Sequence, residues 1–280
     1  MATEKTWFVT GASKGLGLTL VKRLLKEGYK VAATSRSRQS LEKEAGKASA
    51  NFLPLEMDLM DEKSIQNALA DTINQFGKID VVVNNAGYGQ MGTLEELSSE
   101  ESKKNFDVNV FGLLNVIRNV MPHLRGNRSG HIFNISSIGG YTAGFSGWGI
   151  YCATKFAVSG LTESLAAEVK SFGIHVTLVY PGYFRTNFLS QDSMMQPAHP
   201  IADYTEARQS QTFHINEMDG NQAGDPEKLA GALITVAGAE QPPLHLFLGS
   251  DAVNIAGDKM ASVKSDLEKW KSLSVSTDFK

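Results

Sequence analysis

Short runs of β-branched and aromatic residues alternate with longer amphipathic stretches along most of this chain. The strand-like runs are Thr6–Thr10, Val31–Thr34, Phe52–Met57, Val81–Asn84, His131–Ile135 and His175–Val179. The helical patterns between them are Gly15–Glu27, Glu62–Phe76, Glu100–Leu124 and Tyr151–Phe172. Repeated β-α alternation predicts an α/β fold with a doubly wound parallel sheet and helices on both of its faces. Because such sheets bind ligands at the carboxyl ends of their strands, the residues just after each run are the first candidates for a site.

The alternation stops between Arg185 and Gly224, where methionines and aromatic residues stand among polar ones. We expect a long irregular loop there, about 185–224, that serves as a substrate loop or lid. A helix at Glu227–Ala237, a strand at Leu244–Leu248 and a helical stretch at Val253–Trp270 complete the chain. We find no linker or repeat, so we predict one domain over residues 1–280, with a C-terminal extension at about 251–280.

Composition excludes several classes of partner. The 280 residues are 42% hydrophobic, and the formal net charge of −3 is spread without a basic block. Nucleic acid and anionic membrane surfaces are therefore not expected partners. No run approaches the roughly 18 apolar residues of a membrane span, and no signal-like core follows the start, so we expect a soluble, cytoplasmic protein. The single cysteine, Cys152, cannot form an internal disulfide, and we expect it to pack rather than react.

A glycine-rich turn joins the first strand to the first helix. It reads Thr10-Gly11-Ala12-Ser13-Lys14-Gly15-Leu16-Gly17, a GxxxGxG spacing that differs from the common GxGxxG. Glycines permit the tight turn and let backbone N–H groups approach a pyrophosphate, while the helix N-terminus adds partial positive charge. We therefore predict a dinucleotide site.

The end of the second strand indicates which dinucleotide binds. NAD sites carry an acidic residue there for the ribose 2′-hydroxyl, but this chain has Ser35-Arg36. A guanidinium can hold a 2′-phosphate through paired charge-assisted hydrogen bonds, and Lys14 can add a second charge. The sequence thus favours NADP(H) over NAD(H).

Tyr151 and Lys155 stand four residues apart, which places a phenol and an ammonium on the same face of a helix. A nearby ammonium favours the phenolate, so we expect the pKa of Tyr151 to be lowered and the residue to serve as a proton donor. Ser137 lies fourteen residues upstream, at the end of an apolar run. The pair alone is a weak motif, and its meaning depends on the rest of the chain.

Together these residues resemble the short-chain dehydrogenase/reductase family in its single-domain, Rossmann-like form. Thr10 to Gly17 match its TGxxxGxG, Asn84 to Gly87 its NNAG, and Tyr151 with Lys155 its YxxxK. The asparagine of Asn109-Val110-Phe111-Gly112, the serine of Ile135-Ser136-Ser137, and Pro181-Gly182 followed by Thr186 also match. The resemblance extends to about Asp251 and is nearest to NADPH-dependent ketoreductases and carbonyl reductases.

The resemblance implies a role for each catalytic candidate. Tyr151 would give its proton to a substrate carbonyl as hydride arrives from nicotinamide C4. Lys155 would hold the nicotinamide ribose and lower the pKa of Tyr151. Ser137 would hydrogen-bond the carbonyl oxygen, and Asn109 would hold a water that links Lys155 to solvent. We choose Ser137 over Ser136 because strand periodicity points Ser136 to the other face.

Two interpretations stay open for several of the cofactor candidates. Asp58 is either the N-cap of the helix that starts near Glu62 or a partner of the adenine amino group. Thr186 is either a cap or a carboxamide ligand, and Asn85 to Gly87 form a strand-end turn, a wall for the adenine ribose, or both. No metal ligand is predicted. The cofactor residues predicted from motif and resemblance are Gly11, Ser13, Lys14, Gly15, Leu16, Gly17, Ser35, Arg36, Asp58, Leu59, Asn85, Ala86, Gly87, Tyr151, Lys155, Pro181, Gly182 and Thr186.

The substrate should lie between the Ser137-to-Trp148 turn and the irregular stretch 184–213. We predict an apolar, adaptable lining, which fits a ketone or aldehyde with hydrophobic or aromatic bulk. The predicted substrate residues are Ser137, Phe145, Trp148, Tyr183, Phe188 and Met194.

Other functions remain possible at this stage. The same scaffold could oxidise alcohols, including sterols or retinoids, and a non-catalytic NADP-sensing protein is an alternative of another class. Intact Asn109, Ser137, Tyr151 and Lys155 argue against a sensor. The resemblance also implies a homo-oligomer, a dimer or a tetramer, and the C-terminal extension could either pack over a subunit face or cover the core.

Overall fold

The computed structural model describes residues 5–190 and 193–279, and in these residues seven parallel strands form one central sheet. In chain order the strands are β1 (Thr6–Val9), β2 (Lys30–Ser35), β3 (Phe52–Glu56), β4 (Val81–Asn84), β6 (Gly130–Ile135), β7 (Ile174–Pro181) and β9 (His245–Leu248). They lie in the order β3-β2-β1-β4-β6-β7-β9, and every neighbouring pair is parallel. The order reverses between β1 and β4, the kind of point at which doubly wound sheets bind ligands.

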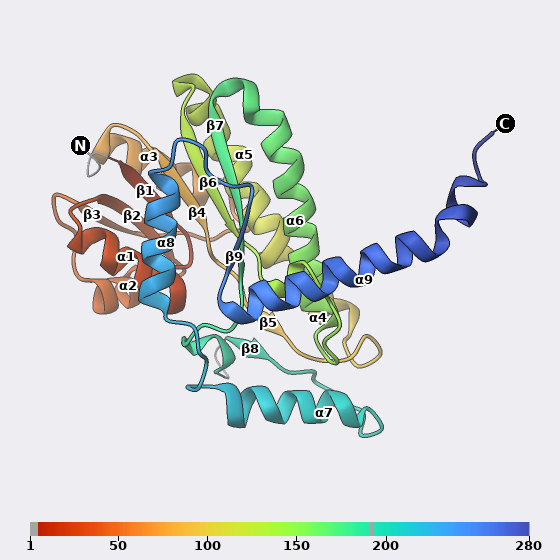
Figure 1. Cartoon of the computed structure of the whole chain (residues 1–280). Coiled ribbons are helices and arrows are strands. Elements are labelled where there is room, and N and C mark those ends of the chain that lie inside the picture. The colour runs from red at the N-terminus through yellow and green to blue at the C-terminus, as the bar shows by residue number, and fades with distance from the viewer. Residues whose placement is uncertain (1–4, 191–192, 280) are drawn as a thin grey trace.

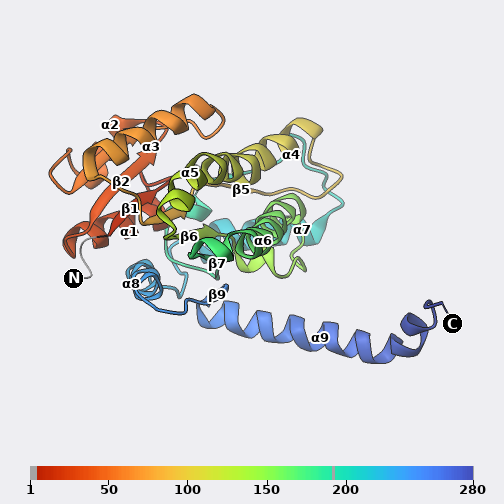
Figure 2. The ribbon, with the colours of Figure 1, turned by 90° about the horizontal axis from the view of Figure 1, so that it is seen from above.

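Helices cover both faces of this sheet, as Figure 2 shows from above. Those on one face are α1 (Gly15–Lys26), α2 (Arg38–Ala45) and α8 (Pro226–Ala237), and those on the other are α3 (Glu62–Phe76), α5 (Leu113–Asn127) and α6 (Gly149–Val169). Side chains alternate across the pleat, so Trp7 and Val9 enter the first layer of core while Phe8 enters the second. The predicted α/β fold is confirmed, and the predicted strands agree with the observed ones to within one or two residues.

The predicted helix at Glu100–Leu124 is three consecutive helical segments. A capping box of Ser98 and Glu101 starts α4 (Ser99–Phe106), a π-helical turn spans Asp107–Gly112, and α5 follows directly. The wider π turn contains Asn109. Local π geometry within a helix frequently marks a functional position, and here it falls on a predicted one.

The expectation of an irregular segment at 185–224 is wrong in part. The segment contains the helix α7 (Thr205–Thr212), which runs into a π-helical turn at Phe213–Met218. It also contains β8 (Met194–Met195), which pairs with β5 (Gly89–Gln90). The short polar sequence of α7 has no apolar stripe, and α2 was not predicted for the same reason.

A buried carboxylate fastens this lid to the body. Glu96, whose side chain is 0% exposed, accepts hydrogen bonds from the backbone N–H groups of Thr93 and Ile201, both at 2.7 Å. Both of its oxygens also accept from the Arg208 guanidinium of α7, at 2.7 and 2.8 Å. These donors lower the pKa of Glu96 although burial opposes them, so the clamp stays ionised at neutral pH.

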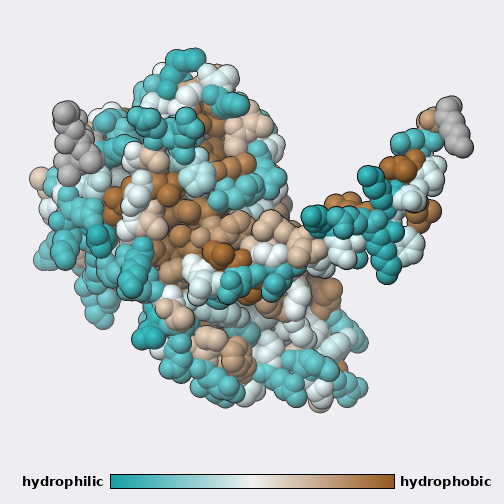
Figure 3. Space-filling view, in the orientation of Figure 1, coloured by the Kyte–Doolittle hydropathy of each residue, from teal (hydrophilic) through white to brown (hydrophobic). Residues whose placement is uncertain are grey.

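The last helix, α9 (Ser250–Val275), is longer than predicted and extends away from the body in Figure 1. Only its first turns are packed, where Ala252 and Ala256 are buried. Asp251 also binds the segment that follows β7, because its Oδ2 accepts a hydrogen bond from the backbone N–H of Tyr183 at 2.7 Å. Farther out the helix is exposed and carries patches of apolar surface (Figure 3). Within the described residues, no helix is long and apolar enough to cross a membrane.

Candidate active site

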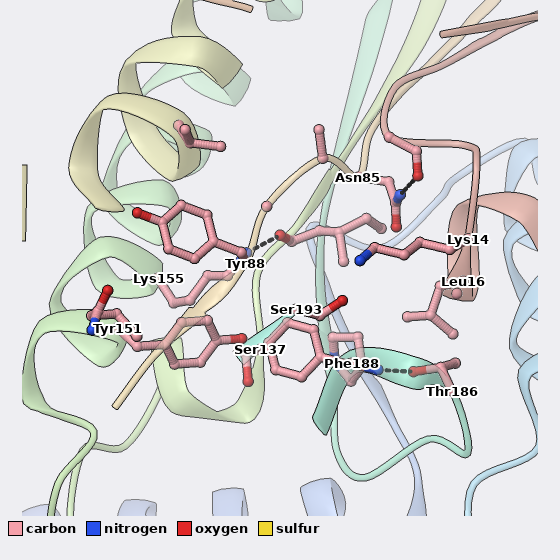
Figure 4. A pocket seen from close by; sticks show the side chains of 18 of the residues that line it. Lys14, Leu16, Asn85, Tyr88, Ser137, Tyr151, Lys155, Thr186, Phe188 and Ser193 are labelled. Atoms are coloured by element: carbon pink, nitrogen blue, oxygen red, sulfur yellow. Dashed lines mark hydrogen bonds between the residues drawn. The ribbon is translucent and has the colours of Figure 1, made fainter. Parts of the chain in front are cut away.

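One cavity of about 590 Å³ lies at the carboxyl ends of the strands and brings most of the predicted residues together. Its cofactor-side lining includes Gly11, Ser13, Lys14, Gly15, Leu16, Ser35, Arg36, Asp58, Leu59, Asn85, Ala86, Gly87, Pro181, Gly182 and Thr186. Ser137, Tyr151 and Lys155 line it together with Phe145, Trp148, Tyr183 and Phe188. Figure 4 shows Lys14 and Leu16 on one side of this cavity and Ser137 and Tyr151 on the other.

The glycine turn needs glycine at each of its three positions. Gly11 and Gly15 have φ of +66° and +58°, in the left-handed region that favours glycine. Gly17 has ordinary φ but no space, since a Cβ there would lie 2.5 Å from Asn85 Nδ2 and 2.6 Å from the Gly11 oxygen. Gly17 therefore packs the start of α1 against the turn behind the cavity wall.

Asn85 fixes this turn to the end of β4. Its Nδ2 donates to the backbone oxygens of Thr10 and Gly11, both at 3.0 Å. In return Thr10 Oγ1 accepts the N–H groups of Asn85 and Ala86, both at 3.1 Å. The structure thus gives the Asn85-Ala86-Gly87 segment a role as a strand-end turn, and its contact with a ribose stays a prediction.

A second cavity, of about 640 Å³, lies beside the glycine turn and is rich in cations. Lys14, Arg36, Lys43 and Arg185 line it, together with one carboxylate from Glu44. Hydroxyl groups of Ser13, Ser35, Ser37 and Ser40 share the same wall. Lys43 and Arg185 were not predicted from the sequence. Lys43 lies on α2, which was not predicted, and Arg185 is about 170 residues from the glycine turn in the sequence.

Asp58 and Thr186 were each predicted to be either a helix cap or a cofactor ligand, and the structure answers the capping question differently for the two. Asp58 is not the helix cap: Asp61 caps α3 by accepting from Lys63 N, while Asp58 Oδ1 accepts from Met60 N at 2.9 Å. Thr186 does cap a short 3₁₀ turn, Asn187–Leu189, by accepting from Phe188 N at 3.3 Å. Both residues also line the cavity, so a ligand role for each stays a prediction.

Ser137, Tyr151 and Lys155 meet where β6 ends against α6. The Ser137 hydroxyl lies beside the Tyr151 phenol, and the two side chains face each other in Figure 4. Lys155 Nζ donates to the backbone oxygen of Ile135 at 3.0 Å. Ser136 Oγ instead donates to the Lys155 backbone oxygen at 3.0 Å. Both serines line the cavity, but the Ser136 hydroxyl is taken up by the backbone of α6, and the choice of Ser137 as the catalytic serine stays a prediction.

The expected lowering of the Tyr151 pKa is wrong. Burial raises the pKa of Tyr151, and the neighbouring Ser137 hydroxyl offsets this only in part. Burial also lowers the pKa of Lys155 to about 8, and its Nζ is 5.8 Å from the Tyr151 ring centroid. Lys155 therefore carries its charge below about pH 8, and Tyr151 holds its proton across the neutral range.

Asn109 supports the site from behind. Its Oδ1 accepts from Tyr88 N at 3.0 Å, and its Nδ2 donates to the Tyr88 oxygen and to Thr154 Oγ1 at 3.0 and 3.1 Å. A Cβ on Gly87 would lie 3.0 Å from Asn109 Oδ1 and 3.6 Å from Lys155 Nζ. Asn109 thus joins the loop after β4 to α6, and the predicted water between it and Lys155 stays a prediction.

The predicted substrate residues line the cavity with one exception. Met194 is buried with Met91 and Leu189 in the core beneath, and its neighbour Met195 lines the cavity instead. Strand alternation in β8 explains the exchange. The sequence did not predict the lining residues Tyr88, Gln90, Leu189, Ser193, His214 and Gln222. Tyr88 is held by Asn105 and Asn109, Gln90 lies in β5, and the others come from the 185–224 segment, so tertiary contacts without a local sequence pattern position them.

Cys152 is a packing residue, as predicted. It is 1% exposed within the cluster that contains Trp148 and Tyr151. Burial raises the pKa of its thiol to about 11, so the thiolate needed for nucleophilic chemistry is scarce at neutral pH.

Comparisons with known proteins agree with this geometry. Residues 5–216 match the family described as short chain dehydrogenase. Oxidoreductase BOA17 of Botryotinia fuckeliana is 35% identical over 98% of this chain and 99% of its own length. A 3-ketodihydrosphingosine reductase of Bacteroides thetaiotaomicron is 35% identical over 86% of each chain. Human retinol dehydrogenase 8 is 33% identical over 87% of this chain and 81% of its own.

Solved structures show the same fold. A short-chain dehydrogenase from Streptomyces avermitilis superposes with a TM-score of 0.89 at 34% identity, covering 98% of both chains. The structure of ElxO with NADP bound has a TM-score of 0.72 at 26% identity, covering 89% of this chain and 99% of its own. A 3-ketoacyl-(acyl-carrier-protein) reductase from Brucella melitensis, complexed with NADH, has a TM-score of 0.73 at 24% identity, covering 89% and 98%. Since these neighbours hold different cofactors, the fold alone does not select between NAD and NADP.

Proposed function

The chain belongs to the short-chain dehydrogenase family of oxidoreductases, and on that premise we propose that it is an NADPH-dependent reductase of ketones or aldehydes. The observation that carries the proposal is the grouping of Ser137, Tyr151 and Lys155 in the same cavity as the glycine turn. A buried phenol that keeps its proton is suited to donate it to a carbonyl oxygen.

The residues of the cavity fit a nicotinamide dinucleotide. The turn from Gly11 to Gly17 offers backbone N–H groups at the N-terminus of α1, where a pyrophosphate is favoured. Lys155 would hold the nicotinamide ribose, and the Asn85-to-Gly87 turn would pack against the adenine ribose. When bound, the nicotinamide supplies the hydride.

The protein's own residues manage the proton. Ser137 orients the substrate oxygen toward Tyr151 and shares the negative charge that develops on it. Tyr151 then gives its proton to that oxygen and becomes a phenolate. The Lys155 ammonium, held by the Ile135 carbonyl, stabilises this phenolate in a site from which water is largely excluded. Asn109, which ties Tyr88 to Thr154, keeps the surrounding backbone in place.

The preference for NADPH is supported by the cation-rich cavity beside the glycine turn. Ser35-Arg36 stand where NAD-binding relatives carry an acid, and Lys14 and Lys43 line the same cavity. A 2′-phosphate there would meet several positive charges and serine hydroxyl groups.

The oxidative direction is the second candidate. The retinol dehydrogenase relative is named for alcohol oxidation, whereas the 3-ketodihydrosphingosine reductase is named for ketone reduction. The protonated state of Tyr151 favours reduction, because oxidation requires the phenolate as the base at the start of the reaction. A non-catalytic NADP sensor is disfavoured because it would have no use for Ser137, Tyr151 and Lys155 grouped in one cavity.

We also propose that the protein is a homo-oligomer in which two copies of α9 pair. The exposed apolar residues Met260, Val263, Leu267 and Trp270 recur at alternating spacings of three and four along the helix. That is the a/d spacing of paired helices, and Leu267 and Trp270 are 66% and 54% exposed in the single chain. A second copy supplies a matching helix.

Replacing Arg36 by Asp tests the cofactor assignment. We expect the ratio of kcat/KM for NADPH to that for NADH to fall by about 10- to 100-fold, the size of one or two charge-assisted hydrogen bonds. Arg38→Asp is the matched control, since the Arg38 side chain pairs with Glu42 on α2. An unchanged ratio in Arg36→Asp would show that the assignment is wrong.

Tyr151→Phe separates an enzyme from a sensor. With a panel of aromatic and aliphatic ketones and aldehydes, we expect kcat to fall by about 10²- to 10⁴-fold, while NADPH still binds by fluorescence titration. Tyr141→Phe, which removes a hydroxyl from a ring packed on Tyr180 and Phe247, should behave as wild type. If wild-type protein consumes NADPH with no member of the panel, the reductase proposal fails.

Charged substitutions on α9 test the oligomer. The double variant Leu267→Glu with Trp270→Glu should sediment as a smaller species than wild type, because two carboxylates cannot be buried unpaired. Ser265→Glu, outside the apolar spacing, should leave the sedimentation coefficient unchanged. A monomeric wild type, or a double variant that sediments like wild type, contradicts the pairing.

A further inference from the structure

A hydrogen-bonded pair in the wall of the cavity has no part in the carbonyl chemistry. The hydroxyl group of Tyr183 lies 2.8 Å from Nε2 of His214. His214 is 6% exposed and comes from the π-helical turn of the lid, where the Trp148 ring packs edge-on against it at 4.9 Å. Both members of the pair line the same cavity as Tyr151.

The direction of this hydrogen bond follows from the other side of the imidazole. Nδ1 of His214 is 2.6 Å from the backbone oxygen of Ser210, which can only accept. Nδ1 therefore carries the proton, and Nε2 must accept. Burial lowers the pKa of His214, so the ring is neutral at physiological pH and Nε2 has no second proton. Tyr183 thus donates its hydroxyl hydrogen bond to His214, and its oxygen can only accept a hydrogen bond from a ligand.

Tyr183 is held firmly and close to the reacting groups. Its backbone N–H is bound by Asp251 at 2.7 Å, and its backbone oxygen accepts from Gly224 N at 2.9 Å. The Trp148 ring packs against both Tyr151 and His214, the partner of Tyr183, at ring-centroid distances of 5.5 and 4.9 Å. The Tyr183 hydroxyl oxygen is therefore a hydrogen-bond acceptor in a fixed position, in the cavity where the substrate carbonyl would meet Tyr151.

Gln222 supplies an independent sign of a polar ligand at this wall. It is 1% exposed and lines the cavity, yet neither its Nε2 nor its Oε1 has a hydrogen-bond partner within the described part of the chain. It stands two residues before Gly224, which bonds to Tyr183. A buried amide left without partners is costly, so an amide in a ligand cavity indicates that the ligand provides them.

We propose that Tyr183, positioned by His214, and Gln222 form a subsite for a hydroxyl group of the substrate. The substrate hydroxyl donates to the Tyr183 oxygen, and its own oxygen accepts from the Gln222 amide. The substrate class is accordingly a hydroxyketone or hydroxyaldehyde with apolar bulk. This inference rests on the proposed carbonyl reduction, and it adds the requirement for a hydrogen-bond donor beyond the carbonyl.

Matched ketones test this directly. 2-Hydroxy-1-phenylethanone, 3-hydroxy-1-phenylpropan-1-one and 4′-hydroxyacetophenone are each compared with the analogue that lacks the hydroxyl and with its methyl ether. The ether keeps the oxygen but cannot donate. We expect kcat/KM for at least one hydroxyketone to exceed both analogues by about 10-fold or more, mainly through KM. If kcat/KM is equal for the three ketones of every set, the inference is wrong while the reductase proposal stands. If the protein reduces none of these ketones, both are wrong.

Variants assign the preference to these residues. Tyr183→Phe and Gln222→Met should each lower the ratio of hydroxyketone to deoxy analogue at least several-fold, whereas Tyr204→Phe on the lid surface should not change it. His214→Phe frees the Tyr183 proton for donation, so the preference should move from the hydroxyketone toward the methyl ether. If His214 had only a structural role, His214→Phe would lower the rates with the hydroxyketone, the deoxy analogue and the methyl ether by the same factor. That result, or an unchanged ratio in Tyr183→Phe, contradicts the subsite.

Discussion

The site depends on a buried ammonium at the end of a strand. Lys155 is 5% exposed, and the Ile135 carbonyl at the end of β6 holds its Nζ. The next two residues of the chain both face α6, since Ser136 Oγ donates to the backbone oxygen of Lys155 and Ser137 lies beside Tyr151. One strand end thus positions the ammonium, its helix and the phenol. The parallel sheet contributes to catalysis chiefly by fixing this short segment.

The rest of the cavity is built from elements that arrive from distant parts of the sequence. Glu96 clamps the lid through Arg208, and the lid brings His214 to Tyr183. Asp251, at the start of α9, holds Tyr183 from behind. The substrate wall is therefore joined both to the lid and to the C-terminal helix. This arrangement places the proposed hydroxyl subsite on elements other than the strand end that holds Lys155.

The sequence predicted the layers of the fold and the residues that meet in the cavity, because both follow from local patterns and motifs. Strand alternation gave the fold and the choice of Ser137, and the glycine turn was apparent from spacing alone. Polar helices such as α2 and α7 lack an apolar stripe, so Lys43 and His214 were missed with them. The pKa of Tyr151 was predicted in the wrong direction, because burial depends on tertiary packing whereas spacing shows only that a lysine is near. Met194 was predicted to line the cavity, but its neighbour Met195 does, because the prediction was off by one residue along β8.

The central claim is that Tyr151 donates a proton while a charged Lys155 stabilises the phenolate left behind. The most direct test is the pH dependence of kcat/KM for carbonyl reduction. Because burial lowers the pKa of Lys155 to about 8, the ammonium is present below that pH and is lost above it. The account predicts a plateau at lower pH and a fall above about pH 8, with no such fall in Lys155→Arg, whose guanidinium stays charged. A reduction rate that rises through pH 8, or a fall that persists in Lys155→Arg, would contradict it.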